Sequence, residues 1–312
     1  MFFLRRIERL RVARNVLVIV LIIIVVILSI WLIRGNGFNG YTSGRAASKQ
    51  AATNAEGSGL TGEYKNSGQI SDLKCESAIA VDLNSGKVLY SKDIHKKLYP
   101  ASLTKLMTAL LLSEHRSKND QITYTTRAKT EPANRMGFSV GNRLTADNAM
   151  KALLIFSAND IATTVAENVS GNVKGFADLM NQKAKVLGMK DTHFENANGL
   201  SDSNHYTSAY DISILARKVY QVPWIIDTME TPSAFVRTTS GKGITVYNTN
   251  KTLGENGCFA GKTGNTAAAG WCLTAYYHSD GRVIVGIVMK SPSEDRLYID
   301  MRDLIAFAKG QK

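Results

Sequence analysis

Three short polar segments supply the side chains with which this chain could perform nucleophilic chemistry. The first contains Ser102 and Lys105, three residues apart at the expected start of a helix, so the lysine amine can reach the serine hydroxyl. A serine hydroxyl is a weak nucleophile until a neighbour accepts its proton, and a buried lysine with a lowered pKa can be that acceptor. Alone, this spacing mostly marks ordinary polar helix residues, so it predicts acyl transfer only together with other groups.

The second segment contains Ser157 and Asn159, two residues apart at the junction of two expected helices. On such a turn, a hydroxyl and an amide can project together into a cleft. Ser157 could then relay a proton toward a leaving amine, and Asn159 could hold Lys105 or a carbonyl of a substrate. Taken alone, the segment is better explained as a helix cap.

The third segment is Lys262-Thr263-Gly264, on an expected strand. A strand at the edge of a cleft can pair with an extended peptide, and a glycine lets the backbone of a ligand approach closely. Lys262 would supply a positive charge, and Thr263 a hydroxyl, for a terminal carboxylate. The expected ligand is a peptide with a free C-terminus, although a lone tripeptide of this kind is more often an ordinary strand end.

The three segments follow one another as SxxK, SxN and KTG, which is the signature of penicillin-binding proteins and class A β-lactamases. Over most of residues 75–308, the chain resembles more narrowly the D-alanyl-D-alanine carboxypeptidases, the low-molecular-weight penicillin-binding proteins. The resemblance rests on Tyr99–Thr108, Ser157–Asp160, Leu187–Phe194, Asn198–Leu200, His205–Asp211 and Gly261–Thr266.

This resemblance implies a reaction and a set of roles. The implied catalytic residues are Ser102, Lys105, Ser157 and Asn159, and the implied substrate-binding residues are Lys262, Thr263, Gly264 and Asn265. Ser102 would form an acyl-enzyme with Lys105 as base, and the backbone N–H groups of Ser102 and Asn265 would form the oxyanion hole. The implied activity is removal of the last D-alanine from peptidoglycan stem peptides, with covalent inhibition by β-lactam antibiotics. Asn265 departs from the pattern, because relatives often have an aromatic residue or histidine there, and this leaves substrate preference open.

Three other functions compete with the carboxypeptidase. A β-lactamase would need a base that hydrolyses its acyl-enzyme quickly, but the middle motif is SAN rather than SDN. Glu195, the only carboxylate between Asp191 and Asp202, is interpreted as a surface residue beside the turn at 198–200. An endopeptidase acting on peptidoglycan cross-links would use the same groups. A β-lactam-sensing, wall-binding protein would keep the cleft without turnover.

The spacing of apolar residues predicts the elements that position these motifs. Strands are expected within 77–90 around a turn at 84–86, and at 235–247, 258–266, 270–277 and 283–289; helices are expected at 102–114, within 145–170, and at 176–187, 210–219 and 294–308. Strands, then helices, then strands and a closing helix predict an α+β fold in which helices cover an antiparallel sheet. A mainly helical subdomain would complete the β-lactamase/transpeptidase-like fold that the resemblance implies.

Charge and hydrophobicity set the N-terminal part of the chain apart. The net charge is +12. Residues 1–70 hold nine of the Lys and Arg residues against three acidic ones, and the rest of the chain has no basic run, so no nucleic-acid partner is expected.

Five arginines precede the apolar run from Val16 to Ile33, which as a helix would rise about 27 Å, close to the thickness of a membrane. We expect a cytoplasmic stub and single-pass cell-membrane anchor at 1–34, a flexible linker at 35–70 and an extracytoplasmic enzyme domain at 71–312. A cleaved signal peptide is the alternative, but its apolar region is usually shorter. Many relatives carry a second β domain and a C-terminal anchor, so the anchor is expected here to have moved to the N-terminus.

The remaining polar and sulfur residues suggest no metal or cofactor. The histidines are scattered, and Cys75, Cys258 and Cys272 have no metal-ligand spacing. Cys258 and Cys272 flank an expected hairpin, so a disulfide and two buried thiols are equally compatible with the sequence. His205 is expected to tie its loop to the helix beginning at Tyr210, and Arg296 to make a similar structural tie near the closing helix.

Overall fold

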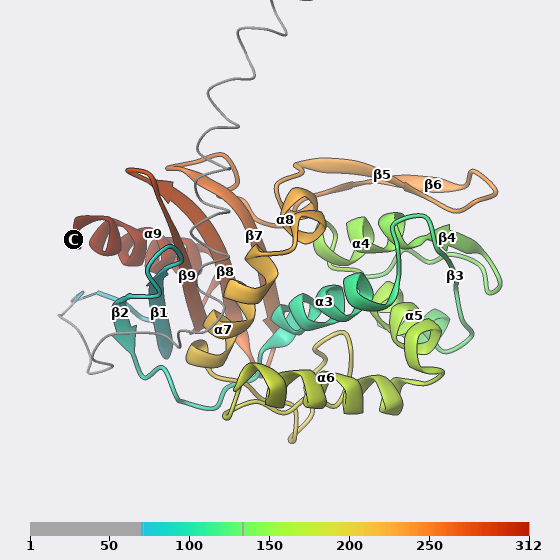
Figure 1. Ribbon diagram of the computed structural model, residues 1–312, viewed down its shortest axis with the longest axis horizontal. Coiled ribbons are helices and arrows are strands. Elements are labelled where there is room, and N and C mark those ends of the chain that lie inside the picture. The colour runs from blue at the N-terminus through green and yellow to red at the C-terminus, as the bar shows by residue number, and fades with distance from the viewer. Residues whose placement is uncertain (1–69, 71, 133, 312) are drawn as a thin grey trace, which may run out of the picture. The chain divides into compact units, whose positions relative to one another are not determined.

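The computed structural model describes residues 70, 72–132 and 134–311 of the chain (Figure 1). The predicted anchor at 1–34 lies outside the described residues, as does all but the last residue of the predicted linker. Among the described residues, no helix combines the length and the apolar character needed to span a bilayer.

A five-stranded antiparallel sheet, with the strand order β2-β1-β9-β8-β7, is the largest element of the fold. Its strands are β1 (Ser77–Asp82), β2 (Val88–Lys92), β7 (Cys258–Thr266), β8 (Gly270–Ser279) and β9 (Arg282–Ser291). The β8–β9 hairpin closes at Asp280 and Gly281, whose φ angles of 48° and 75° fit the two-residue turn that an Asp-Gly pair favours. β7 is an edge strand, so one side of its backbone is available to face a cleft.

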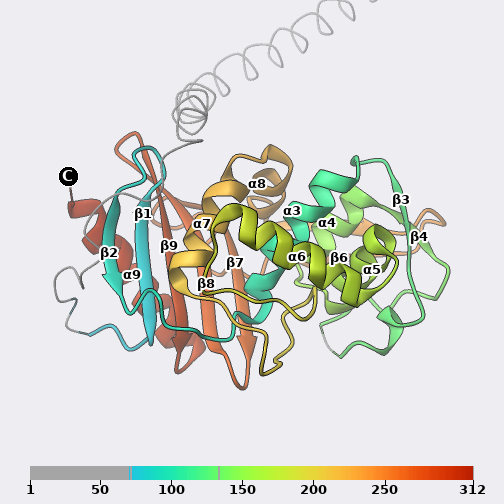
Figure 2. The ribbon, with the colours of Figure 1, turned by 60° about the horizontal axis from the view of Figure 1, so that its bottom comes forward.

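The two faces of the sheet pack against different helices (Figures 1 and 2). Because successive strand residues point to opposite faces, Ile284 and Val288 of β9 pack with α9 (Glu294–Gly310), whereas Val285 and Ile287 enter the larger core with α7 (Ala209–Tyr220). Both faces are thus covered, which explains why β1 and β9 are apolar along nearly their whole length.

The remaining helices form a subdomain beside the sheet. They are α3 (Lys105–His115), α4 (Ala146–Leu154), α5 (Asn159–Ser170), α6 (Val173–Leu187) and α8 (Pro223–Met229), with the short elements η2 (Ala128–Thr130), β3 (Gln121–Thr123) and β4 (Arg143–Thr145). α3 is buried from Lys105 to Leu112, because the other helices surround it. A 3-10 turn, η1 (Ala101–Thr104), leads into α3 and contacts β7. The start of the central helix therefore meets the edge of the sheet.

One predicted strand, at 235–247, is wrong. The structure has an antiparallel hairpin there, made of β5 (Ser233–Arg237) and β6 (Gly243–Tyr247). Gly241, at φ 87°, lies in the turn that separates the two strands, and a Ser-Gly pair of this kind is a turn signal. α8 was also not predicted, although Pro223 in its first turn is a helix-start signal. The other predicted helices and strands are present, with shifts at their ends.

The structure also answers whether Cys258 and Cys272 form a disulfide and whether Arg296 makes a structural contact. Cys258 pairs in register with Tyr277, whereas Cys272 pairs with Gly264 near the other end of β7, so the two cysteines form no disulfide and are buried free thiols. Arg296 makes the structural tie expected of it: its Nε donates to Asp300 Oδ1 at 2.8 Å on α9, and it also binds Asp72.

Candidate active site

The Ser102 hydroxyl and the Lys105 amine lie in direct contact where η1 runs into α3. Lys105 Nζ is 2.8 Å from Ser102 Oγ, and the lysine side chain is completely buried. Removing an ammonium group from water disfavours its charged form, so burial, assisted by the nearby charge of Lys262, holds the pKa of Lys105 well below its usual value. The lowered pKa favours the neutral amine, which is the form of lysine that can accept a proton.

The other partners of Lys105 orient its lone pair. Nζ also lies 2.8 Å from Asn159 Oδ1 and 2.7 Å from the backbone carbonyl oxygen of Asn198. Both oxygens can only accept hydrogen bonds, so they take two protons of the nitrogen. The neutral amine has only two protons, and its lone pair is therefore directed at the hydroxyl of Ser102. This is the geometry that a general base for Ser102 requires.

A second serine–lysine pair lies across the cleft. Lys262 Nζ, on β7, donates to Ser157 Oγ at 2.9 Å and to its neighbour's carbonyl oxygen at 2.7 Å. Burial lowers the pKa of Lys262 to about 7, so its charge responds to whatever anion enters the cleft. Ser157 has a left-handed backbone conformation, with φ 66°, at the α4–α5 junction. Non-glycine residues held in this region are strained and concentrate at functional sites.

β7 packs closely against the nucleophile's turn because residue 264 is glycine. A Cβ built on Gly264 would lie 3.0 Å from the backbone nitrogen of Ser102 and 3.1 Å from the carbonyl oxygen of Pro100. Next to it, Thr263 Oγ1 donates to Thr249 Oγ1 at 2.7 Å, and the exposed Asn265 donates its side-chain amide to the carbonyl of Gly270 at 3.0 Å. The KTG segment thus forms the wall opposite Ser102.

These residues border one open cleft of about 530 Å³. It is lined by Ser102, Ser157, Asn159, Thr263, Gly264 and Asn265, together with Asn134, Asn248, Thr249, Lys251, Trp271, Glu294, Leu297 and Tyr298. Lys105 and Lys262 lie fully buried beside it, hydrogen-bonded to the two serines. All eight residues predicted from the sequence therefore come together at this cleft.

Several residues that support the site carried no predicted role. Asn198 supplies an acceptor for Lys105, and its segment was noted only as part of the family resemblance. Asp160, buried at the start of α5, accepts hydrogen bonds from Tyr124 and from the backbone N–H groups of Met136 and Gly137. This fixes the loop that brings Asn134 to the cleft. Nothing in the local sequence distinguished Asp160 from a helix-capping residue.

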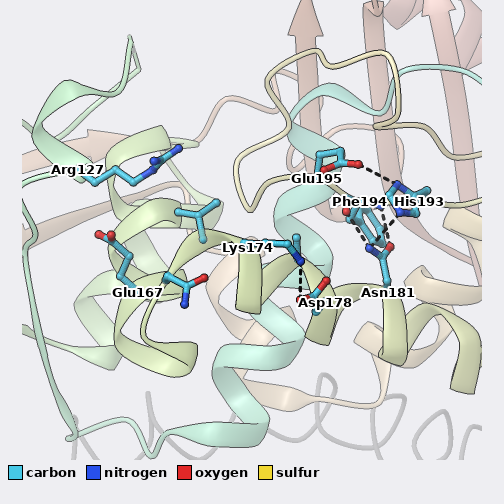
Figure 3. Close-up of a pocket in the computed structure, with 11 residues that line it drawn as sticks. Arg127, Glu167, Lys174, Asp178, Asn181, His193, Phe194 and Glu195 are labelled. Atoms are coloured by element: carbon cyan, nitrogen blue, oxygen red, sulfur yellow. Dashed lines mark hydrogen bonds and ion pairs between the residues drawn. The ribbon is translucent and has the colours of Figure 1, made fainter.

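Glu195 lies away from this cleft. Its side chain is 38% exposed and pairs with His193 at 3.5 Å, in a separate pocket of about 590 Å³ that also contains Arg127 and Asn181 (Figure 3). No residue that the structure describes lines both pockets. Glu195 is thus the surface residue that the sequence indicates, which argues against it as the deacylating base of a β-lactamase.

His205 is structural, but it does not make the contact predicted for it. Instead of binding the start of α7, its Nε2 lies 2.8 Å from Thr104 Oγ1, and its Nδ1 accepts the N–H of Glu195 at 3.1 Å. With Nδ1 as acceptor, the single proton of neutral histidine is on Nε2 and is donated to Thr104. His205 therefore ties the 195–205 loop to the turn that carries Ser102. Burial lowers its pKa to about 4.

Burial of His205 should make the stability of the fold sensitive to acid. Because the folded pKa of about 4 is below the unfolded value of about 6.5, the unfolded chain binds the proton more readily, and stability is lost as pH falls between these values. From pH 7.5 to 4.5 the loss from this group should be about 2–3 kcal/mol. Urea unfolding at both pH values should show a flatter pH dependence for His205→Gln than for the wild type. An equal pH dependence in both proteins would contradict the assignment.

The antiparallel sheet with its helical subdomain, together with the two serine–lysine pairs beside β7, is the arrangement of a penicillin-binding protein, with all three sequence motifs at the cleft. A family model described as D-alanyl-D-alanine carboxypeptidase matches residues 64–293. The chain belongs to this peptidase family, as the sequence motifs indicated.

Individual relatives agree with this assignment. The chain is 31% identical over 247 residues to the D-alanyl-D-alanine carboxypeptidase DacF of Bacillus subtilis, covering 76% of this chain and 63% of that protein. It is 32% identical over 210 residues to a D-alanyl-D-alanine endopeptidase of Pseudomonas aeruginosa, covering 65% of this chain and 66% of that protein. The structure of Penicillin-Binding Protein D2 from Listeria monocytogenes, in the cefotaxime-bound form, superposes with a TM-score of 0.69 at 26% identity, covering 77% of this chain and 99% of that one. The chain thus spans less than two thirds of the length of these curated relatives.

Proposed function

We propose that the chain is a serine carboxypeptidase that removes the terminal D-alanine from peptidoglycan stem peptides. Membership of the peptidase family supports the reaction class. The observation that carries the proposal is the set of contacts around Lys105, whose two fixed acceptors direct its lone pair at Ser102.

Acylation would proceed as follows. Ser102 Oγ attacks the carbonyl carbon of the penultimate D-alanine, and its proton moves to Lys105 Nζ. The oxyanion that forms would be stabilised by the backbone N–H groups of Ser102 and Asn265. When the C–N bond breaks, the proton taken up by Lys105 passes through Ser157 to the leaving amine, so free D-alanine departs and Lys105 is neutral again. Water then hydrolyses the ester on Ser102, which regenerates the enzyme.

Lys262 would bind the terminal carboxylate of the substrate. An arriving anion favours the ammonium form of a lysine whose pKa burial has lowered to about 7. The hydroxyl of Thr263 lines the cleft beside it.

A β-lactam, which also bears a carboxylate, would be attacked in the same way, but its leaving nitrogen stays attached to the acyl group. The cefotaxime-bound relative supports this reaction with β-lactams.

Cleavage of cross-links is a second candidate activity, because a relative is named as an endopeptidase. It would use the same residues on a substrate whose leaving amine belongs to another stem peptide. An open cleft of about 530 Å³ is compatible with either substrate.

One digestion separates these activities. Purified muropeptides are treated with the protein, and the products are analysed by mass. Pentapeptides should lose one alanine, and the Ser102→Ala variant should release none. Cleaved cross-linked dimers with intact pentapeptides would favour the endopeptidase instead. A penicilloyl adduct without turnover of either substrate would favour a β-lactam sensor and overturn the proposal.

We further propose that the domain works outside the cytoplasm, tethered to the cell membrane. The support comes from the sequence alone: five arginines precede the apolar run at 16–33, and basic flanks stay in the cytoplasm. Protease added to intact spheroplasts should then digest the domain, and protection would contradict this topology.

A further inference from the structure

Glu131 is a carboxylate that lies behind the Ser102–Lys105 pair and has no role in the mechanism above. Its Oε2 accepts a hydrogen bond from Asn198 Nδ2 at 3.0 Å, and its Oε1 accepts one from Thr163 Oγ1 at 2.7 Å. Glu131 thus links the loop after η2 to α5 and to the 196–200 turn. Both of its oxygens are directed at named partners inside the fold.

Asn198 connects Glu131 to the base. Its side-chain amide is held by Glu131, its Oδ1 accepts the N–H of Leu200 at 3.0 Å, and its backbone carbonyl lies 2.7 Å from Lys105 Nζ. With both ends of the side chain fixed, the residue cannot rotate freely, and the direction of its carbonyl is set. The contact that orients the Lys105 amine therefore depends on Glu131.

Glu131 also contributes charge. The ionisable groups that face Lys105 are Lys262 from β7, Asp160 from α5, and Glu131. Asp160 is saturated by donors from Tyr124 and three backbone N–H groups. Among the described residues, no lysine or arginine forms an ion pair with the Glu131 carboxylate. Arg135 contacts Glu131 through the backbone carbonyl of Glu131 rather than through its carboxylate. The Glu131 carboxylate therefore faces Lys105 without a competing cation among the described residues.

We propose that Glu131 is a positioning residue for acylation, which holds the Asn198 carbonyl against Lys105 and places a balancing negative charge behind the amine. The inference rests on the proposed function, because it assigns a role in activating Ser102. It distinguishes Glu131 from the deacylating carboxylate of a β-lactamase, which would act on water after the acyl-enzyme has formed.

The charge and the hydrogen bond have separable consequences. A negative charge nearby favours the ammonium form, so its removal should lower the pKa of Lys105 further and make the neutral base available at lower pH. Loss of the hydrogen bond between Glu131 and Asn198 should slow acylation, because the Lys105 amine is no longer oriented toward the Ser102 hydroxyl. A residue with only a structural role would slow the reaction without moving its pH dependence.

The test measures acylation of Ser102 by a fluorescent penicillin as a function of pH. Glu131→Gln should lower the second-order acylation rate constant roughly tenfold and shift its acid limb by about one unit to lower pH. Thr163→Val keeps the charge but removes one hydrogen bond, so it should slow acylation while leaving the acid limb in place. Glu195→Gln, the same change in the separate pocket, should alter neither.

Each outcome bears on the inference. An unmoved acid limb in Glu131→Gln, with a melting temperature near that of the wild type, would overturn it. Normal acylation with a trapped adduct would also overturn it, because Glu131 would then act in deacylation. If Glu131→Gln does not fold, Thr163→Val tests the positioning role: slower acylation with an unshifted acid limb would support it, and an unchanged acylation rate would overturn it. Failure of the wild type to form any adduct would overturn the proposed function and the inference with it.

Discussion

Replacing Lys105 with methionine should reduce acylation of Ser102 by a factor of at least roughly 10³, because the base in contact with the hydroxyl is removed. Methionine has nearly the length of lysine and suits a fully buried position. The variant removes the donor to the Asn198 carbonyl, at a cost of about 1–3 kcal/mol. Acylation by penicillin, followed by intact-protein mass, measures the effect.

Two controls make this result specific. Ser102→Ala should also abolish the adduct, but it keeps Lys105 and its two other partners, so it should unfold near the wild-type temperature. Released D-alanine should fall in parallel with the adduct in both variants. If Lys105→Met retained acylation within tenfold of the wild type, the base for Ser102 would have to be another group.

The residues that meet at the site could be predicted because its key pairs are local. Ser102 and Lys105 share a helical face at a spacing of three, and Ser157 and Asn159 share one turn, so each pair is set by backbone geometry rather than by the tertiary fold. The order of the three motifs then indicated which segments must meet. The same reasoning predicted the long strands and helices, whose apolar periodicity is strong.

What could not be predicted depends on contacts between distant loops. Asn198 reaches Lys105 across 93 residues of sequence, and Glu131 reaches Asn198 across 67. Loops have no periodicity that would fix which polar side chains turn inward, and the partner of His205 was misassigned for the same reason. Short elements could not be predicted either. α8 has only seven residues, and the β5–β6 hairpin was predicted as one strand because its turn interrupts the apolar pattern for only a few residues.

The 198–200 turn also predicts a severe backbone effect at Gly199. Its φ is 89°, and a Cβ built on it would lie 1.9 Å from the carbonyl oxygen of Ala101, the residue before the nucleophile. Backbone atoms cannot yield as a side chain can, so Gly199→Ala must displace either this turn or the η1 turn. Displacement of either moves the Asn198 carbonyl away from Lys105, or moves Ser102 itself.

Gly188→Ala is the matched control for Gly199→Ala. Gly188 also has a positive φ, 79°, but nothing lies within 4 Å of a Cβ built there. It should cost about 1–2 kcal/mol from backbone strain alone and leave acylation unchanged. Gly199→Ala adds the clash, so the free energy of unfolding from urea titration should fall by about 4 kcal/mol or more, and acylation should slow at least roughly 100-fold. Equal losses in the two variants would mean that the close approach of residue 199 to Ala101 does not exist in solution. A much larger loss at Gly199 than at Gly188 would show that the site depends on backbone contact between the two turns, beyond the side chains that perform the chemistry.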